Sequence, residues 1–181
     1  MQRAVHYLET GSQSPYYNLA FEEYVLTHRT QGDYLLLWQN ENTIVVGQNQ
    51  NTEAEINRPF VEAHHINVVR RSTGGGAVYH DLGNLNYSFI TDAGDKASMD
   101  RFTSPVVEAL KGLGLQAEAS GRNDILVEGR KVSGTAQRLY GQALSDLMGY
   151  LVTHLTWDDG TPVVLEQYFD WRAQNDDEVL R

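Results

Sequence analysis

Three consecutive glycines at positions 74–76 interrupt the first half of this 181-residue chain. Residues 66–71 alternate as a strand does before the glycines, and residues 77–79 and 85–90 have the composition of strands after them. Glycine reaches positive φ without steric cost and carries no side chain, so its backbone can lie flat against a ligand. The pattern therefore predicts a loop inside a sheet region that a ligand can approach closely.

The rest of the chain mixes helical and β-type patterns without the regular strand–helix alternation of a parallel α/β fold. Helical spacing predicts a helix that begins near Ser14, and further helices at residues 59–65 and 99–113. β-type runs predict strands at residues 5–8, 34–38, 43–47, 115–119, 125–128 and 131–137. The second and third of these strands are expected to form one hairpin, and the last two another. The class that follows is α+β.

The C-terminal part is less regular. Leucine or methionine at positions 144, 147, 148, 151 and 155 recurs at helical spacing and predicts a helix. A short apolar run at residues 163–165 follows, and the chain ends in a polar stretch rich in Asp and Glu.

Composition excludes several classes of protein. Fourteen Lys and Arg against 24 Asp and Glu leave a net charge of -10, which argues against a nucleic-acid-binding surface. No apolar run approaches the roughly 20 residues that cross a bilayer, and the first residues lack a signal peptide's apolar core. We therefore expect a cytoplasmic protein without a membrane partner, folded as a single domain over residues 1–181. The absence of cysteine excludes disulfides and thiol nucleophiles.

The glycine loop follows Arg71 and Ser72, and this combination is suited to binding an anion. Successive backbone N–H groups can bind phosphate or carboxylate oxygens, and an adjacent guanidinium can supply a fork of charged donors. A glycine-rich turn beside two surface arginines, Arg70 and Arg71, fits the same pattern equally well. The segment is neither a Walker loop nor a Rossmann fingerprint, because no Gly-Lys-Ser/Thr ending or helix follows it.

Lys131 opens a strand that contains the small residues Ser133, Gly134 and Ala136, which leave room beside the lysine. An ammonium there could stabilise the charge that develops when a carboxylate attacks an α-phosphate. The alternative is a solvated lysine on an exposed hairpin. Asn123 and Asp124 precede the hairpin and fit either a local turn or a magnesium-binding position.

Two other interpretations are weaker. His80 and Asp81 are adjacent in a predicted strand and point to opposite faces, and no serine or cysteine nucleophile accompanies them, which argues against a hydrolase. His64 and His65 lack the spacing and the acidic partners of a metal site.

Residues 70–84, 121–124 and 129–136, read together, resemble the lipoate-protein ligase A family, which has a biotin/lipoate ligase-like catalytic domain. Residues 18–23 and 38–51 are also similar to that family, so the resemblance extends from about residue 5 to residue 138. It implies an α+β fold of mixed and antiparallel sheets with flanking helices.

The resemblance implies an enzyme that uses ATP and Mg²⁺ to convert lipoic acid to lipoyl-adenylate and then transfers the acyl group to a protein lysine. The implied acceptors are lipoyl domains of 2-oxoacid dehydrogenase complexes or the glycine-cleavage H protein. By position, Lys131 matches the catalytic lysine, and Asp124 matches a possible magnesium ligand. The matching positions for substrate and nucleotide are Arg71, Ser72, Gly74, Gly75, Gly76, Val78, His80, Asn123, Ser133, Gly134 and Ala136.

The sequence departs from the family after Arg138, where a His-His-Gly-Thr-Leu-Leu-like strand is expected and is missing. The accessory C-terminal domain of many members is also expected to be absent, so a separate accessory chain could be required. Three alternatives remain: a non-catalytic or partner-dependent lipoate-binding protein, an octanoyl or lipoyl transferase that works without cysteine, and a biotin ligase. The missing cysteine disfavours the transferase, because related transferases use a cysteine nucleophile. The biotin ligase is disfavoured because the glycine loop lacks an alternating Gly-Arg pattern.

Overall fold

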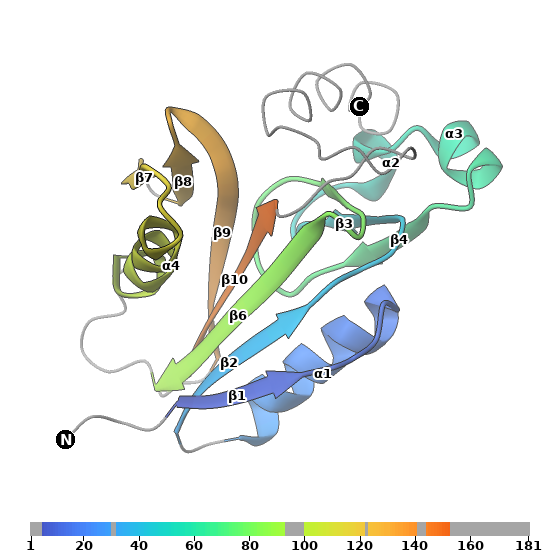
Figure 1. Cartoon of the computed structure of the whole chain (residues 1–181). Helices are drawn as coiled ribbons and strands as arrows, with labels where there is room; N and C mark the ends of the chain where they lie inside the picture. The colour runs from blue at the N-terminus through green and yellow to red at the C-terminus, as the bar shows by residue number, and fades with distance from the viewer. Residues whose placement is uncertain (1–4, 30–31, 93–99, 122, 141–143, 153–181) are drawn as a thin grey trace.

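The computed structural model describes residues 5–29, 32–92, 100–121, 123–140 and 144–152. Two sheets carry the fold, and helices flank them (Figure 1). The large sheet has seven strands in the order β1-β2-β6-β10-β9-β8-β7, and the small sheet has three in the order β4-β3-β5. This mixed architecture confirms the α+β class.

The bounds of the elements are as follows. The helices are α1 (Pro15–His28), α2 (Thr52–Glu55), α3 (Arg58–Ala63) and α4 (Asp100–Gly112). The large sheet contains β1 (Val5–Glu9), β2 (Asp33–Trp38), β6 (Asn84–Asp92), β7 (Ala117–Ser120), β8 (Asp124–Val127), β9 (Arg130–Tyr140) and β10 (Leu144–Val152). The small sheet contains β3 (Thr43–Val46), β4 (Asn67–Arg70) and β5 (Val78–His80).

Helix α1 begins where the sequence predicts. Ser14 caps the helix by accepting a hydrogen bond from the Tyr17 N–H, and Pro15 occupies the first turn, where its missing N–H costs nothing. Val25 and Leu26 of the helix pack with Trp38 of β2 in one of three hydrophobic clusters. The helix is thereby fixed to the large sheet, close to β6 and β4.

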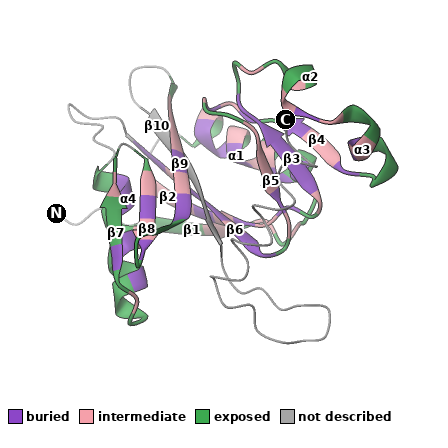
Figure 2. Ribbon diagram, turned by 90° about the horizontal axis from the view of Figure 1, so that it is seen from above, coloured by how far each residue is buried: buried purple, intermediate pink, exposed green. Residues whose placement is uncertain are grey.

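Two further clusters hold the remaining elements. Val107 and Leu110 of α4 pack on Ile125 and Val132, which fixes α4 to the β8–β9 hairpin. In the small sheet every residue of β3 is buried, and Ile44 packs with residues from the α2–α3 segment. Figure 2 shows the buried strand β3 between the partly exposed strands β4 and β5. The two sheets therefore have separate cores, and the segments between them are free to form a cleft.

The predicted hairpin of residues 34–38 and 43–47 is wrong. β2 pairs with β1 and β6 in the large sheet, whereas β3 pairs with β4 and β5 in the small sheet. The polar residues 39–42 connect the two sheets instead of turning the chain back. β5 and β6 are likewise consecutive strands of different sheets. The β8–β9 hairpin is present, with a register irregularity at Ile125/Leu126.

The predicted helix at residues 144–155 is also wrong for the described part, because β10 is a strand between β6 and β9. A strand with a neighbour on each side satisfies its backbone hydrogen bonds in two ladders, and this tertiary pairing overrides helical spacing of leucines. Leu155 and the apolar run at 163–165 lie outside the described residues. The single-domain interpretation, which concerns residues 1–181, stays a prediction.

Candidate functional site

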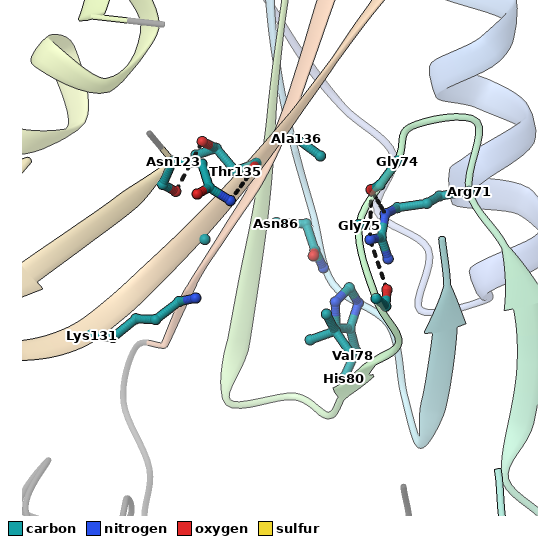
Figure 3. Close-up of a pocket in the computed structure, with 12 residues that line it drawn as sticks. Arg71, Gly74, Gly75, Val78, His80, Asn86, Asn123, Lys131, Thr135 and Ala136 are labelled. Atoms are coloured by element: carbon teal, nitrogen blue, oxygen red, sulfur yellow. Dashed lines mark hydrogen bonds between the residues drawn. The ribbon is translucent and has the colours of Figure 1, made fainter. Parts of the chain in front are cut away.

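A cleft of about 150 Å³ opens between the glycine loop of the small sheet and the β8–β9 hairpin of the large sheet. Figure 3 shows Arg71, His80 and the loop on one side, Asn123 and Lys131 on the other, and Asn86 of β6 between them. The lining residues are Arg71, Gly74, Gly75, Gly76, Val78, His80, Asn86, Asn123, Lys131, Gly134, Thr135 and Ala136. Segments far apart in the sequence thus form one site.

Arg71 is a buried organiser of the glycine loop. Its side chain is 5% exposed, and Nη2 donates to the carbonyl oxygens of Gly74 and Gly76, both at 2.8 Å. Nη1 donates to the Val45 oxygen at 3.0 Å, and the backbone N–H bonds to Val46. Charged donors form strong hydrogen bonds, so these contacts hold the loop against β3. The guanidinium shapes this wall of the cleft and brings positive charge to it.

Arg70 organises the neighbouring segment in the same way. Its Nη1 atom donates to the carbonyl oxygens of Gly47, Gln48 and Gln50 at 2.8–3.1 Å, and Nη2 donates to the Thr52 hydroxyl at 2.6 Å. The two adjacent arginines are therefore structural clamps on the loops that follow β3 and β4.

Close approach explains two of the glycines. A Cβ atom on Gly47 would lie 1.8 Å from the Gly75 carbonyl oxygen, which no ordinary packing permits. Gly75 has a φ of 100°, and a Cβ there would lie 2.7 Å from Nη2 of Arg71. A Cβ on Gly74 or Gly76 would meet nothing within 4 Å. The loop's shape therefore requires glycine at 47 and 75, and Gly47 was absent from the predicted site.

The opposite wall is more exposed. The Lys131 side chain is 48% exposed, and its Nζ atom lies 2.9 Å from Oδ1 of Asp124. Asn123 is fixed to β9, because its Nδ2 atom donates to the Thr135 oxygen at 3.1 Å and the Thr135 N–H donates to the Asn123 oxygen at 2.9 Å. An ammonium held over the sheet by a neighbouring carboxylate faces the cleft.

Two buried polar side chains also line the cleft, His80 on the side of the glycine loop and Asn86 between the walls. His80 is 2% exposed, and its Nδ1 atom lies 3.3 Å from Nδ2 of Asn40. Asn86 is fully buried; its Nδ2 atom donates to the Trp38 oxygen at 3.3 Å, and its Oδ1 atom has no hydrogen-bond partner in the described residues. A buried acceptor without a partner is costly, so a donor from a ligand would be favoured there.

A buried carboxyl on α1 interacts electrostatically with Arg71. Glu22 of α1 accepts a hydrogen bond from the Ser88 hydroxyl, and the Trp38 indole donates to the same hydroxyl at 3.4 Å. Burial raises the pKa of Glu22 to about 7; the Ser88 hydrogen bond lowers the pKa, Glu23 raises it, and Arg71 and Arg138 lower it. The carboxyl is thus electrostatically linked to the cleft.

Most of the predicted site residues line the cleft; the exceptions are Ser72, Ser133 and Asp124. Ser133 is fully buried, and its hydroxyl lies 2.9 Å from the hydroxyl of Tyr87, a residue on the opposite face of β6 from Asn86. Asp124 contacts the site through Lys131. The sequence interpretation missed Asn86 and Thr135; the signal for Asn86 was the alternation of small polar residues (Asn84, Asn86 and Ser88) with apolar residues in β6.

The chain combines two mixed sheets with a cleft beside a glycine loop. Comparison with known proteins identifies the class of catalytic domain that has these features. The chain belongs to the lipoyl protein ligase A/B catalytic domain family, whose model matches residues 14–155. The resemblance inferred from the motifs is confirmed, and the matched region extends through β10.

Individual relatives agree with this assignment. The chain is 57% identical over 126 residues to lipoate-protein ligase LplJ of Bacillus subtilis (strain 168), covering 68% of this chain and 38% of the relative. It therefore spans about two fifths of the length of that curated relative.

Two solved structures are similar. One is a bi-partite lipoate protein ligase with its E2 lipoyl domain from Thermoplasma acidophilum, at 28% identity and a TM-score of 0.77, covering 98% of this chain and 73% of that one. The other is lipoate-protein ligase A bound with ATP, at 26% identity and a TM-score of 0.74, covering 92% and 74%. In the part of the chain that is described, no helix is long and apolar enough to span a bilayer.

Proposed function

We propose that this chain activates lipoate with ATP to lipoyl-adenylate and passes the lipoyl group to a lysine of an acceptor protein. The observation that carries the proposal is the cleft itself, in which Lys131 lines one wall and the glycine loop held by Arg71 lines the opposite wall. Its similarity to lipoate-protein ligases, one of them bound with ATP, supports the choice of substrates.

In the first half-reaction, a carboxylate oxygen of lipoate attacks the α-phosphorus of ATP. A new O–P bond forms, and the bond to pyrophosphate breaks. Lys131 stabilises the negative charge that builds on the transferring phosphate, while the glycine backbone and Arg71 set the shape and charge of the facing wall. Because the reactants are both anions, positioning and charge neutralisation are the main requirements on the protein.

In the second half-reaction, the amine of an acceptor lysine attacks the acyl carbon and AMP leaves. We propose lipoyl domains, of 2-oxoacid dehydrogenase complexes or of the glycine-cleavage H protein, as acceptors in the cytoplasm. The Thermoplasma structure, which pairs a ligase with an E2 lipoyl domain, supports this class of acceptor.

Magnesium is part of the proposal, and a single carboxylate beside the cleft fits a magnesium ion that is bound mainly by phosphates and water. Among the described residues no group of three or more His, Cys, Asp or Glu side chains could hold a metal ion. Asp124 supplies one carboxylate at the edge of the cleft, and Mg²⁺ commonly combines one or two carboxylates with phosphates and water. Bound with the nucleotide, the ion would neutralise phosphate charge.

A second candidate function is a ligase that depends on a separate accessory chain. Two observations favour it: the similarity to a ligase described as bi-partite, and the span of about two fifths of the curated relative's length, 38%. A lipoate-binding protein without turnover is the remaining alternative.

The experiment that tests these readings incubates the protein with lipoate, ATP and Mg²⁺, with and without a lipoyl domain. Lipoyl-adenylate and a lipoylated acceptor are the expected products. Adenylate without transfer supports the partner-dependent form, and retained lipoate without either product supports the binding protein. Acyl transfer from a lipoylated or octanoylated donor without ATP would contradict the ligase proposal.

A further inference from the structure

A buried chain of polar side chains connects α1 to His80 of the cleft. It runs from Thr10, which is partly buried, through Asn18 and Asn40 to His80. Asn18, Asn40 and His80 are exposed by 0%, 0% and 2%. Asn18 Nδ2 lies 3.0 Å from Asn40 Oδ1, and Asn40 Nδ2 lies 3.3 Å from His80 Nδ1. The reaction steps above use none of these groups, although His80 lines the cleft.

The orientation of the first amide is fixed by the backbone. Asn18 Nδ2 donates to the carbonyl oxygens of Ser12 at 3.0 Å and Gln39 at 2.8 Å, and a carbonyl oxygen can only accept. The Thr10 hydroxyl donates to Asn18 Oδ1 at 2.7 Å. Both ends of the Asn18 amide are therefore assigned by their partners, and the nitrogen is the end that faces Asn40.

This assignment propagates to the histidine. Asn18 Nδ2 has two N–H groups for three oxygens, those of Ser12, Gln39 and Asn40, so these contacts share its protons. The Asn40 oxygen is the end that can accept from this nitrogen, so the Asn40 nitrogen faces His80. If the Asn40 amide were turned over, two N–H donors would face each other in a buried site, which is costly. Because Asn40 Nδ2 is a donor, Nδ1 of His80 must accept. A neutral imidazole has one donor and one acceptor nitrogen, so the ring proton lies on Nε2.

We propose that Asn18 and Asn40 are positioning residues that hold His80 as the neutral Nε2–H tautomer, so that the cleft has a donor at this position. Such a donor suits a ligand's acceptor atom, such as a carboxylate or phosphate oxygen. This last step rests on the proposed function; the tautomer itself does not.

The tautomer is measured directly on the intact protein. Two-bond ¹H–¹⁵N correlation spectra of protein with ¹⁵N-labelled histidine distinguish a protonated from an unprotonated ring nitrogen, and His80→Gln identifies the His80 signals. We expect wild-type His80 with its proton on Nε2. A proton on Nδ1 in the wild type would overturn the proposal, whatever any variant does.

Asn40→Asp then tests whether Asn40 sets the tautomer. The side chain keeps its shape and keeps an acceptor for Asn18, but it presents a carboxylate oxygen to His80, so Nδ1 should become protonated. The control is Asn51→Asp, which adds the same charge at an exposed position. Asn51 caps the N-terminus of α2, and Asp can cap a helix equally well, so this substitution should not disturb the fold. An Nδ1 atom that stays unprotonated in Asn40→Asp would contradict the positioning role.

Adenylate formation supplies the functional readout. Loss of one ligand hydrogen bond corresponds to a decrease of about tenfold, and we expect this in Asn40→Asp but not in Asn51→Asp. A switched tautomer with unchanged adenylate formation would refute the role of the donor in the cleft. If the wild type forms no adenylate, the proposed function fails while the tautomer assignment is still decided by the spectra.

Discussion

The two walls of the cleft are built on different principles. Arg71 is buried and donates hydrogen bonds to backbone carbonyl groups of the glycine loop, whereas Lys131 is half exposed and forms an ion pair with a neighbouring carboxylate. Buried charged hydrogen bonds are costly to break, but an exposed ion pair contributes little to stability. The arginine wall should therefore matter for the fold and the reaction alike, and the lysine wall mainly for the reaction.

Replacement of Lys131 should give the largest effect on activity. Lys131→Ala removes the charge proposed to stabilise the transferring phosphate, so the rate of adenylate formation should fall by about 100-fold or more. The free energy of unfolding should change by less than about 1 kcal/mol, because the ion pair is exposed. A rate assay and denaturant unfolding measure both.

Lys111→Ala is the matched control for that substitution. Lys111 also forms an exposed ion pair, with Glu108 at 3.1 Å, but it lies on α4 and does not line the cleft. Its adenylate rate should equal that of the wild type. An equal loss in both variants, or none in Lys131→Ala, would refute the proposed role of Lys131.

Disturbing the arginine wall should affect stability and activity together. In Gly47→Ala the new Cβ would lie 1.8 Å from the Gly75 oxygen, so the loop has to move; we expect a loss of about 1–3 kcal/mol in unfolding free energy and a clear fall in adenylate rate. Gly74→Ala, which meets nothing within 4 Å, is the control. Equal stability of the two variants would show that the close approach is not a constraint.

The contrast between the walls also shows what the sequence could reveal. Motif residues such as Lys131, Gly75 and Asn123 were recognised because they lie in short motifs that resemble those of the ligase family, and the structure gathers them around one cleft. Gly47 and Asn86 were missed, because their importance comes from contacts across the two sheets. Such contacts depend on tertiary arrangement, which local spacing does not encode.

The same reasoning applies to the fold. Helix α1 was predicted well because capping at Ser14 and Pro15 is local chemistry. The hairpin proposed for residues 34–47 failed because pairing partners of β2 and β3 lie in different sheets, far along the chain. β10 was mistaken for a helix because its place between β6 and β9, not its own leucine spacing, decides its conformation.

A pH titration sharpens the comparison at the arginine wall. The pKa of Glu22 is raised from 4.5 to about 7 in the folded protein, so the folded state holds this proton longer than the unfolded state. The contribution of Glu22 to the free energy of unfolding should therefore be largest below pH 4.5 and should decrease as the pH rises to about 7.

Glu22→Gln removes that titration. Its unfolding free energy relative to wild type should increase between pH 5 and pH 8 by about 2–3 kcal/mol, measured by denaturant unfolding. Glu23→Gln is the control, since Glu23 is partly exposed and forms its ion pair with Arg138 at 2.7 Å. A difference between Glu22→Gln and wild type that does not vary with pH would exclude a raised pKa at Glu22.

The smallest expected effect on stability concerns the carboxylate beside Lys131. Asp124→Asn exchanges a partly exposed ion pair for a neutral amide of the same size, so the unfolding free energy should fall by less than about 1 kcal/mol.

If Asp124 also helps to hold Mg²⁺, the magnesium concentration needed for half-maximal adenylate formation should rise, and excess Mg²⁺ should restore part of the rate. Glu108→Gln, which breaks the ion pair with Lys111, should leave the magnesium requirement unchanged. A rate defect in Asp124→Asn that magnesium does not relieve would instead assign Asp124 to the orientation of Lys131, and the lysine wall would then contain a positioning pair in place of a metal-binding edge.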